Sequence, residues 1–491
     1  MTTRRVVLTS LFLIAVWFAY SIAFWGLPVA FRYHITQQFD TNADGKIDTW
    51  EIEDRTAKTG TFAVEKDTDF DGTVDQIEFN NPKQGRSKLS SEKNHRSVTI
   101  CLDGVPYTDM QLLWQQGYFR EFGKPGKLIS VFPSLSDIAI TEALHTAKVP
   151  GYENLFFDLT SNRISGGAAS TLSKAKIPYL DALDYDEPGI FKGLAYVLPL
   201  KTYHADLGRL LKRWAASNKT AYQAHICSSD AICHVVGPEE FRTHLLQIDQ
   251  LLREILIQAE GNIDITVFSD HGNSHVASRR IDLEGFLAKN GFHLGSSLDG
   301  DQAVVAPAFG LVGAIALYSR PQNTQRLAEL LSQMEGVDFA TYANGNSVLV
   351  VSKGGRARIN NRHNEDRLEY EMMSGDPLNL RQTIAKMSQQ GILDSESSAD
   401  GDAWFRATAE HEYPDGVNAL YRGVTNHVKN PASLLLSLKD EYHYGSRFFG
   451  RLVTLRSTHG SLVRSSMTGF YMSNKPKDGS TLPSRNLLGK S

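Results

Sequence analysis

The sequence predicts an α/β fold built on a mostly parallel sheet with helices on both faces. Four apolar segments, at 97–102, 220–226, 263–269 and 314–319, have the length and composition of buried strands. Between the second and third of these segments, residues 239–259 place leucines and isoleucines on one stripe at helical spacing, as expected of a helix that covers a sheet. Strands that alternate with helices in this way favour parallel pairing.

Composition and charge exclude some classes of protein. Of the 491 residues, 41% are hydrophobic and 22% are charged, which is typical of a globular chain and excludes one that is wholly disordered. The formal net charge is only -4, and no block of Lys and Arg interleaved with aromatic residues occurs. The sequence therefore argues against nucleic-acid binding.

The N-terminus carries an apolar run that predicts a membrane anchor at 6–30. After Arg4 and Arg5 the chain holds no charge until Arg32, which is long enough to cross a bilayer as a helix. The two arginines favour a cytoplasmic N-terminus, so we expect a single-pass protein that contacts the lipid bilayer through this helix and holds its main domain on the extracytoplasmic side. A cleaved signal peptide is the alternative, because "SIA" before Phe24 is a passable cleavage site, and the protein would then be secreted.

Residues 36–80 contain two acidic loops of the same pattern, "DTNADGKIDTWE" at 40–51 and "DTDFDGTVDQIE" at 67–78. Both fit the EF-hand calcium loop, in which oxygen ligands alternate along the chain, a glycine permits a sharp turn and a final Glu supplies two oxygens. The sequence therefore predicts a tandem EF-hand pair that binds Ca²⁺ structurally. The expected ligands of the first loop are Asp40, Asn42, Asp44, Lys46 (through its carbonyl), Asp48 and Glu51; those of the second are Asp67, Asp69, Asp71, Thr73 (through its carbonyl), Asp75 and Glu78.

The remaining chain divides into a linker and a large domain. Residues 81–96 are polar and rich in Lys and Ser, as expected of a linker. The large domain is predicted to cover 97–475, with a less regular insertion at about 340–435 that could cap a site.

The three cysteines fit an exported protein. Cys227 and Cys233 would close a short loop and would oxidise readily outside the cytosol, although the sequence also allows two reduced core thiols. Cys101 lies in an apolar run and is predicted to be a buried thiol.

Acidic and imidazole side chains follow several predicted strands. Functional residues of open α/β sheets gather at the carboxyl ends of strands. Three carboxylates and three imidazoles at such positions suit two ions of the Zn²⁺ class. The residues are Asp103, Asp230, His234, Asp270, His271 and, near the C-terminus, His459.

In chain order the motifs D-G, D-x-x-x-H-x-x-G, S-D-H-G and T-H-G resemble the alkaline phosphatase superfamily, in particular its nucleotide pyrophosphatase/phosphodiesterase-like branch. The resemblance covers roughly 97–320 and 440–470. It implies one metal bound by Asp230, His234 and His459, and a second bound by Asp103, Asp270 and His271. Zinc is the expected metal and manganese is possible.

The resemblance also implies a Ser or Thr nucleophile at the start of a helix, within 130–144. The position that the branch uses before its Phe-Pro pair is Val131, which cannot attack phosphorus. Ser134 is the preferred replacement, because it could cap the helix with Asp137 as its capping-box partner, and Ser136 is the second choice.

These observations predict an exported, membrane-anchored, metal-dependent hydrolase of phosphate esters, with a phosphodiester or pyrophosphate as substrate. A phosphotransferase on the same scaffold is one alternative. The other is a calcium-binding protein with a catalytically silent phosphatase-like domain, which Val131 favours.

Overall fold

The computed structural model describes residues 26–57, 60–80, 85–89, 96–167, 177–362, 367–475 and 479–488. Most of the predicted anchor at 6–30 and most of the predicted linker at 81–96 lie outside these residues. Within the described ranges, no helix is both long enough and apolar enough to span a bilayer.

A six-stranded sheet forms the centre of the large domain, in the order β10-β6-β11-β24-β7-β25. Every strand runs in the same direction except β24, which is antiparallel to both of its neighbours. The predicted mostly parallel sheet is therefore present. Its strands are β6 (Ser97–Leu102), β7 (Gly126–Ile129), β10 (Ala221–Ile226), β11 (Asp264–Phe268), β24 (Thr468–Ser473) and β25 (Leu482–Pro483).

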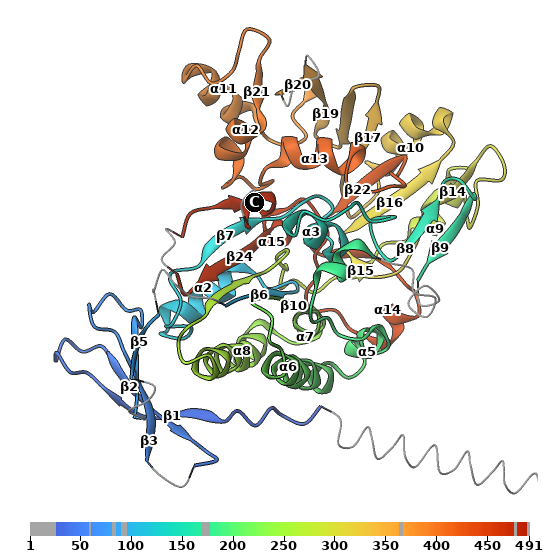
Figure 1. Ribbon diagram of the computed structural model, residues 1–491. Coiled ribbons are helices and arrows are strands. Elements are labelled where there is room, and N and C mark those ends of the chain that lie inside the picture. The colour runs from blue at the N-terminus through green and yellow to red at the C-terminus, as the bar shows by residue number, and fades with distance from the viewer. Residues whose placement is uncertain are drawn as a thin grey trace, which may run out of the picture.

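Helices cover both faces of this sheet (Figure 1). On one face, α2, α6 and α8 bury their apolar stripes in a common core with β6, β10 and β11. On the other face, α3 and α13 pack between this sheet and a second one. The helices of the domain are α2 (Tyr107–Gln115), α3 (Ser136–Ala143), α5 (Gly189–Ala195), α6 (Pro199–Ala215), α7 (Ser228–Val235), α8 (Pro238–Gln258), α9 (Leu283–Lys289), α10 (Thr324–Leu331), α11 (Arg381–Gln389), α12 (Gly401–Thr408), α13 (Gly416–Thr425), α14 (Phe449–Leu452) and α15 (Arg464–Met467).

The second sheet has nine strands, in the order β13-β14-β16-β22-β17-β18-β19-β20-β21. It takes up β16 at 314–319, which the sequence assigned to the parallel sheet; β16 instead pairs antiparallel with β22. An apolar segment of six residues suits either sheet, so its composition could not decide between them. The strands are β13 (His293–Gly295), β14 (Ala303–Val305), β16 (Ala314–Ser319), β17 (Val337–Asn344), β18 (Ser347–Ser352), β19 (Gly355–Arg362), β20 (Arg367–Gly375), β21 (Ser398–Asp400) and β22 (Leu434–Leu438).

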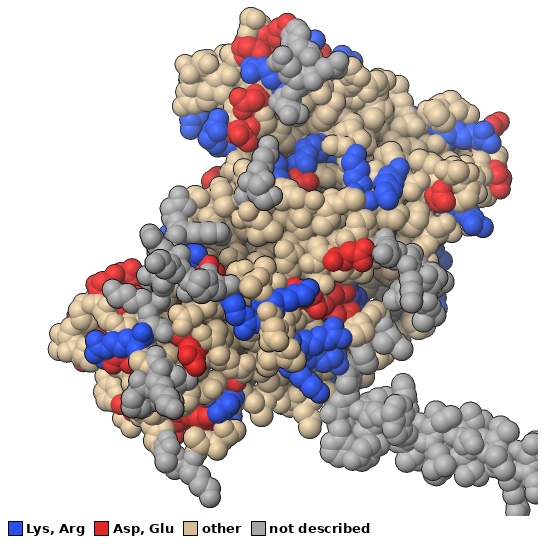
Figure 2. Space-filling view, in the orientation of Figure 1, with Lys and Arg blue, Asp and Glu red and all other residues tan. Residues whose placement is uncertain are grey.

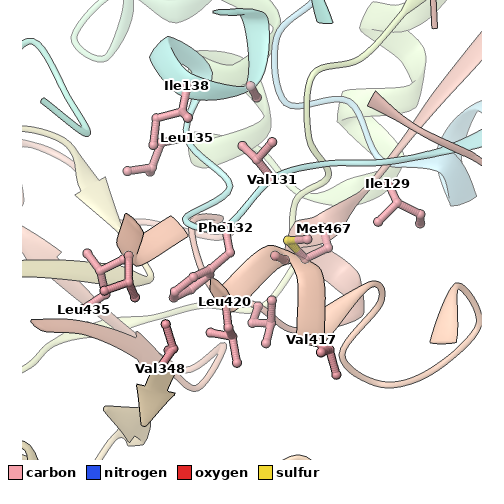
Figure 3. Packing of buried hydrophobic residues seen from close by; sticks show 14 of the residues in the cluster. Ile129, Val131, Phe132, Leu135, Ile138, Val348, Val417, Leu420, Leu435 and Met467 are labelled. Atoms are coloured by element: carbon pink, nitrogen blue, oxygen red, sulfur yellow. The ribbon is translucent and has the colours of Figure 1, made fainter. Parts of the chain in front are cut away.

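An apolar core joins the two sheets. The segment after β7 enters this core through Val131 and Phe132, which are both buried. Figure 3 shows the Phe132 ring near Val348 and Leu435 of the second sheet and near Leu420 of α13, with Val131 on the other side of the segment. The segment that leads into α3 is therefore held from both sides. Two smaller sheets, at the edge of the domain, contain β8 (Leu155–Asp158) with β9 (Arg163–Gly166), and β12 (Arg279–Arg280) and β15 (Leu311–Val312) with β23 (Tyr442–Gly445).

The N-terminal module is a five-stranded antiparallel sheet, so the predicted EF-hand pair is wrong in its architecture. Each acidic loop joins two strands and has no flanking helix. Buried and half-buried residues alternate along "TWEIED", which is the two-residue period of a strand. The segments on either side of the acidic loops therefore form strands and not helices. In Figure 2, acidic and basic side chains lie interspersed over this module. Its strands are β1 (Tyr33–Phe39), β2 (Thr49–Asp54), β3 (Thr61–Lys66), β4 (Gln76–Phe79) and β5 (Arg86–Lys88).

This module is docked firmly on the large domain. Its apolar residues, including Trp50 and Ile77, belong to the same core as α8. The backbone amides of Arg32 and Tyr33 donate to one carboxylate oxygen of Glu254 on α8, at 2.9 and 3.1 Å. Residues 26–30, the last five of the predicted anchor, are not helical and lie along α6, where Nδ1 of His204 donates to the Gly26 carbonyl.

A buried ionic cluster lies at the junction of the module and the large domain. Glu65 of β3 pairs with Arg120, and Arg253 of α8 donates to Glu121 at 2.8 Å and to Asp249 at 3.0 Å. All five residues are at most 5% exposed. Removing one partner from such a cluster leaves an uncompensated buried charge.

We therefore expect Arg253→Met to lower the free energy of unfolding by about 3–5 kcal/mol, because Glu121 and Asp249 lose their cation. Arg356, which pairs with Glu329 at the surface, is the matched control, and its Met variant should cost about 1 kcal/mol or less. Urea unfolding of the two variants measures the difference. Equal losses would contradict a structural role for the cluster.

Candidate metal centre

The first ligand cluster contains Asp230, His234 and His459. Asp230 and His234 stand one turn apart on α7, which begins two residues after β10 ends, so both project from the same face of the helix. His459 comes from the loop before α15. His234 Nε2 lies 3.1 Å from one Asp230 oxygen, and His459 Nε2 lies 3.7 Å from the other. The three candidate ligand atoms all lie within 4.8 Å of one another.

The second cluster contains Asp103, Asp270 and His271. The parallel strands β6 and β11 pair in register from Ser97 with Asp264 to Cys101 with Phe268, so the residues that follow them emerge side by side. His271 Nε2 lies 3.4 Å from Asp103 and 3.5 Å from Asp270. These ligand atoms also lie within 4.8 Å of one another.

The two clusters adjoin. The imidazole rings of His271 and His459 stack with their centroids 3.9 Å apart, one ring from each cluster. The structure thus brings together all six residues that the sequence singled out, in the two groups that the resemblance implied.

Each of the three histidines presents the same ring nitrogen to its cluster. His234 Nδ1 donates to the Ser457 carbonyl at 2.7 Å, His271 Nδ1 to the Gly272 carbonyl at 2.9 Å and His459 Nδ1 to the Ser134 carbonyl at 2.9 Å. A carbonyl only accepts hydrogen bonds, so Nδ1 carries a proton and Nε2 is the nitrogen that faces the carboxylates. Metal-binding histidines are held in this way by their outer-shell partners.

The carboxylates need positive charge beside them. Asp270 is buried, and its Oδ2 accepts no hydrogen bond from any residue that the structure describes. Burial raises the pKa of Asp270 to about 7. Burial also disfavours charge on His271, but Asp270 and Asp103 outweigh this effect and raise the pKa of His271 to about 10. A divalent cation would supply this charge and displace the proton, so the donor set fits metal binding.

The hydroxyl of Ser136, and not that of Ser134, contacts the second cluster. Ser136 is the first residue of α3, and its Oγ donates to Asp103 at 3.1 Å and lies 3.3 Å from His271 Nε2. Ser134 Oγ is buried elsewhere, where it donates to the Ser461 carbonyl at 3.0 Å and accepts from the Gly460 amide at 3.1 Å. The sequence preference for Ser134 therefore does not agree with the geometry.

The predicted capping box is absent, which explains this difference. The N-cap of α3 is Leu135, which makes no side-chain cap bond, so the helix begins one residue later than the box requires. Asp137 instead accepts a hydrogen bond from the Tyr179 hydroxyl at 2.7 Å. Val131 is buried among apolar residues of the core between the sheets, as Figure 3 shows.

Sequence reasoning missed three side chains that contact the ligands. His225 at the end of β10 lies between Asp103, 3.1 Å from its Nε2, and Asp186, 2.9 Å from its Nδ1. Asn273 donates to Asp230 at 2.9 Å, and the Tyr196 hydroxyl lies 3.4 Å from the other oxygen of Asp230. The position of His225 at the end of a predicted strand is a sequence feature that could have identified it. No sequence feature singles out Asn273 or Tyr196.

The predicted disulfide between Cys227 and Cys233 is wrong. Both thiols are free, and Cys101 is the buried thiol that the sequence predicted. Cys227 caps α7 and Cys233 lies in its last turn. Six residues of helix separate their Cα atoms by about 9 Å, which exceeds the reach of a disulfide.

The acidic loops of the N-terminal module keep only part of the expected ligand set. In each loop the first aspartate, Asp40 or Asp67, accepts the amide of the loop glycine at 2.8 Å. Carboxylate oxygens of Asp67, Asp69 and Asp71 lie within 4.8 Å of one another. The other expected side chains have protein partners: Asn42 contacts Asp44, Asp48 accepts from Thr41, Asp75 from Thr68 and Glu51 from Thr61, while Glu78 pairs with Lys66 and Arg86. The carbonyl-bearing positions, Lys46 and Thr73, donate their amides to Asp44 and Asp71.

Fold and site together define a class of protein: a mixed α/β domain with a candidate two-metal centre at the carboxyl ends of parallel strands. No protein-family model matches the chain, and no curated protein matches it. Among solved structures, it is similar to phosphonoacetate hydrolase from Sinorhizobium meliloti 1021 in complex with phosphonoformate, with a TM-score of 0.40 and 12% identity. It is also similar to human ectonucleotide pyrophosphatase/phosphodiesterase 5, with a TM-score of 0.43 and 10% identity.

Both similarities cover 80% of this chain and 92% of the other chain. The human protein carries the name of the branch that the sequence motifs resemble. At TM-scores below 0.5 and these identities, the similarities do not by themselves assign an activity. The assignment has to come from the site.

Metal analysis tests the two clusters. After incubation with excess Zn²⁺ and dialysis, we expect the wild type to retain two zinc ions per chain. His459→Gln and Asp270→Asn should each lose about one, because each removes a ligand from one cluster only. Asp415→Asn, a buried carboxylate near Arg485, is the control and should retain both. Two zinc ions in all three variants would contradict the assignment.

Proposed function

We propose that the protein is a metal-dependent hydrolase of phosphate esters, of the phosphodiesterase or pyrophosphatase type, with Ser136 as its nucleophile. The position of the Ser136 hydroxyl, 3.1 Å from Asp103 and 3.3 Å from His271, carries this proposal. A hydroxyl at this position, beside the second candidate ligand cluster, could attack phosphorus. Val131, which favoured a silent domain, is irrelevant to the chemistry because it lies in the core.

In the proposed reaction the Ser136 oxygen bonds to phosphorus as the bond to the ester oxygen breaks. The leaving oxygen departs with the electron pair and takes up a proton, and water then cleaves the phosphoserine to restore the hydroxyl. Two divalent ions, zinc or manganese, held by the six ligands would favour loss of the serine proton and offset the charge of the phosphoryl oxygens.

The chain's own residues fix the geometry of this step. Ser136 is the first residue of α3, so the amides of the first helical turn face an anion bound there. His459 is held by the Ser134 carbonyl, two residues before the nucleophile, and this bond ties one ligand to the nucleophile loop. The Tyr196 hydroxyl, beside Asp230, is placed to contact a bound substrate.

Replacing the serines separates the two candidates. Ser136→Ala should lower kcat on bis(4-nitrophenyl) phosphate by at least about a hundredfold, because it removes the nucleophile. Ser134→Ala should keep kcat, since its backbone carbonyl still holds His459, and should only lower stability. Ser136→Thr retains a hydroxyl and should recover part of the activity. Full activity in Ser136→Ala, or no activity in the wild type with Zn²⁺ or Mn²⁺, would overturn the proposal.

We further propose that the two loops of the N-terminal module bind Ca²⁺ as strand-flanked loops. The clustered carboxylates of Asp67, Asp69 and Asp71 support this proposal, together with the positive φ angles of Gly45 and Gly72, +89° and +95°. The expected role is to stabilise the module on the large domain.

Calcium should therefore raise the melting temperature of the full chain, because binding to the folded state alone stabilises it. Asp67→Asn with Asp71→Asn should reduce the rise, whereas Asp158→Asn, at a half-buried aspartate outside the module, should leave the rise unchanged. A melting temperature that is insensitive to Ca²⁺ and to chelator would contradict the proposal.

The apolar run at 6–30 leads us to propose a single-pass membrane protein with the hydrolase domain on the extracytoplasmic side. The absence of charge between Arg5 and Arg32 supports this proposal.

A further inference from the structure

A hollow lined by arginines opens at the edge of the large domain. We call it the arginine hollow. Its volume is about 430 Å³, within the range of small-molecule sites. Strands β12 and β23, helix α14 and the segment after α14 form its walls. Its polar lining side chains are Arg279, Arg280, Arg447, Arg451, His443 and Ser278.

The positive charge of the hollow is only partly neutralised. Arg279 pairs with Glu335 at 2.6 Å. Arg280 pairs with Glu284 at 2.6 Å, and Arg447 shares this same carboxylate at 3.4 Å. Arg451 has no ion pair with any described residue.

Other titratable groups near the hollow do not cancel this charge. Asp282, near Arg280, uses its carboxylate to accept the Gly285 amide at the start of α9. His443 hydrogen-bonds with Ser278 at 2.9 Å. Burial lowers the pKa of His443 to about 4, with Arg280 and His234 adding to the effect, so this ring is neutral near pH 7. The guanidinium groups therefore leave an excess of positive charge.

The hollow is connected to the metal centre through two chain segments. One runs from His271 to Arg280, and the other from Arg451 to His459, so each has a candidate ligand at one end and a hollow arginine at the other. The two segments are hydrogen-bonded to each other, from the Ser274 amide to the Thr458 carbonyl, at 2.9 Å. The Arg456 amide also donates to the His234 carbonyl at 2.8 Å.

We propose that the arginine hollow binds a second phosphate group of the substrate, carried on the same molecule as the phosphoryl group that is cleaved. Guanidinium groups bind phosphate through two parallel hydrogen bonds, and their charge is independent of pH. The two hydrogen-bonded segments that join the hollow to His271 and His459 favour a role for the hollow in the same substrate site. This inference rests on the proposed hydrolase function, and it narrows the substrate class to esters with at least two phosphate groups.

Two substrates that differ by one phosphate test the inference. They are the 4-nitrophenyl ester of thymidine 5′-phosphate and the same ester with a second phosphate on the 3′ oxygen. In the full chain with Mn²⁺, the double variant Arg447→Gln with Arg451→Gln should lower kcat/KM for the bisphosphate about tenfold more than for the monophosphate, mainly through KM. Arg381→Gln, an exposed arginine of α11 without an ion pair to the described residues, should change neither value.

An equal effect on both substrates, or no effect, would overturn the inference while the wild-type activity still supports the proposed hydrolase. No cleavage of either ester by the wild type would overturn the proposed hydrolase instead. In that case a binding measurement tests whether the arginine hollow is an anion site. Inorganic phosphate should raise the melting temperature of the wild type and of Arg381→Gln more than that of the double variant, against sodium acetate at equal ionic strength. Equal rises in all three proteins, or an equal rise with acetate, would overturn it.

Discussion

Three buried carboxylates, Asp103, Asp230 and Asp270, impose the main electrostatic constraint on this molecule. Ionised carboxylates are costly to bury unless positive charge lies beside them. The residues that approach these carboxylates in the two clusters are histidines. Each of the three histidines donates its Nδ1–H to a backbone carbonyl, so its Nε2 faces the carboxylates. Without a metal ion this positive charge has to come from protonated imidazole, as the raised pKa of His271 shows, and a divalent cation could take its place.

The topology of the central sheet explains why distant residues converge. Strands β6, β10 and β11 are neighbours and parallel, so the residues after each one emerge at the same edge. His459 reaches this edge from the segment that precedes the antiparallel β24. The Gly313 amide also bonds to the His459 carbonyl, so the second part of the domain supports this ligand. The residues that form or support the candidate metal centre therefore come from segments spread over almost the whole large domain.

The convergence of the six candidate ligands could be predicted from the sequence, because residues that follow neighbouring parallel strands emerge at the same edge of the sheet. Ser136 could not be ranked above Ser134, because the start of α3 depends on contacts of the Ser134 hydroxyl with residues more than three hundred positions away. The calcium-loop pattern constrains the residues of the loop and not the segments on either side of it, so it could not show that strands flank the two loops. The proposed bridge between Cys227 and Cys233 failed because the loop between them is a helix. The contacts of His225 could not be predicted, because only the folded chain brings a carboxylate to each side of its ring.

The docking of the N-terminal module limits how the proposed anchor and the metal centre can be arranged. The Gly26 carbonyl accepts from His204 on α6, and Val29 packs against the adjoining core. Tyr196, which contacts Asp230, lies only three residues before α6 begins. The three residues from Tyr196 to Pro199 span at most about 11 Å, and the helical rise from Pro199 to His204 is about 8 Å. Gly26 therefore contacts a histidine that lies within about 19 Å of a residue of the candidate metal centre. A membrane anchor that ended near residue 30, as proposed, would end on α6, on the part of the large domain that also carries Tyr196.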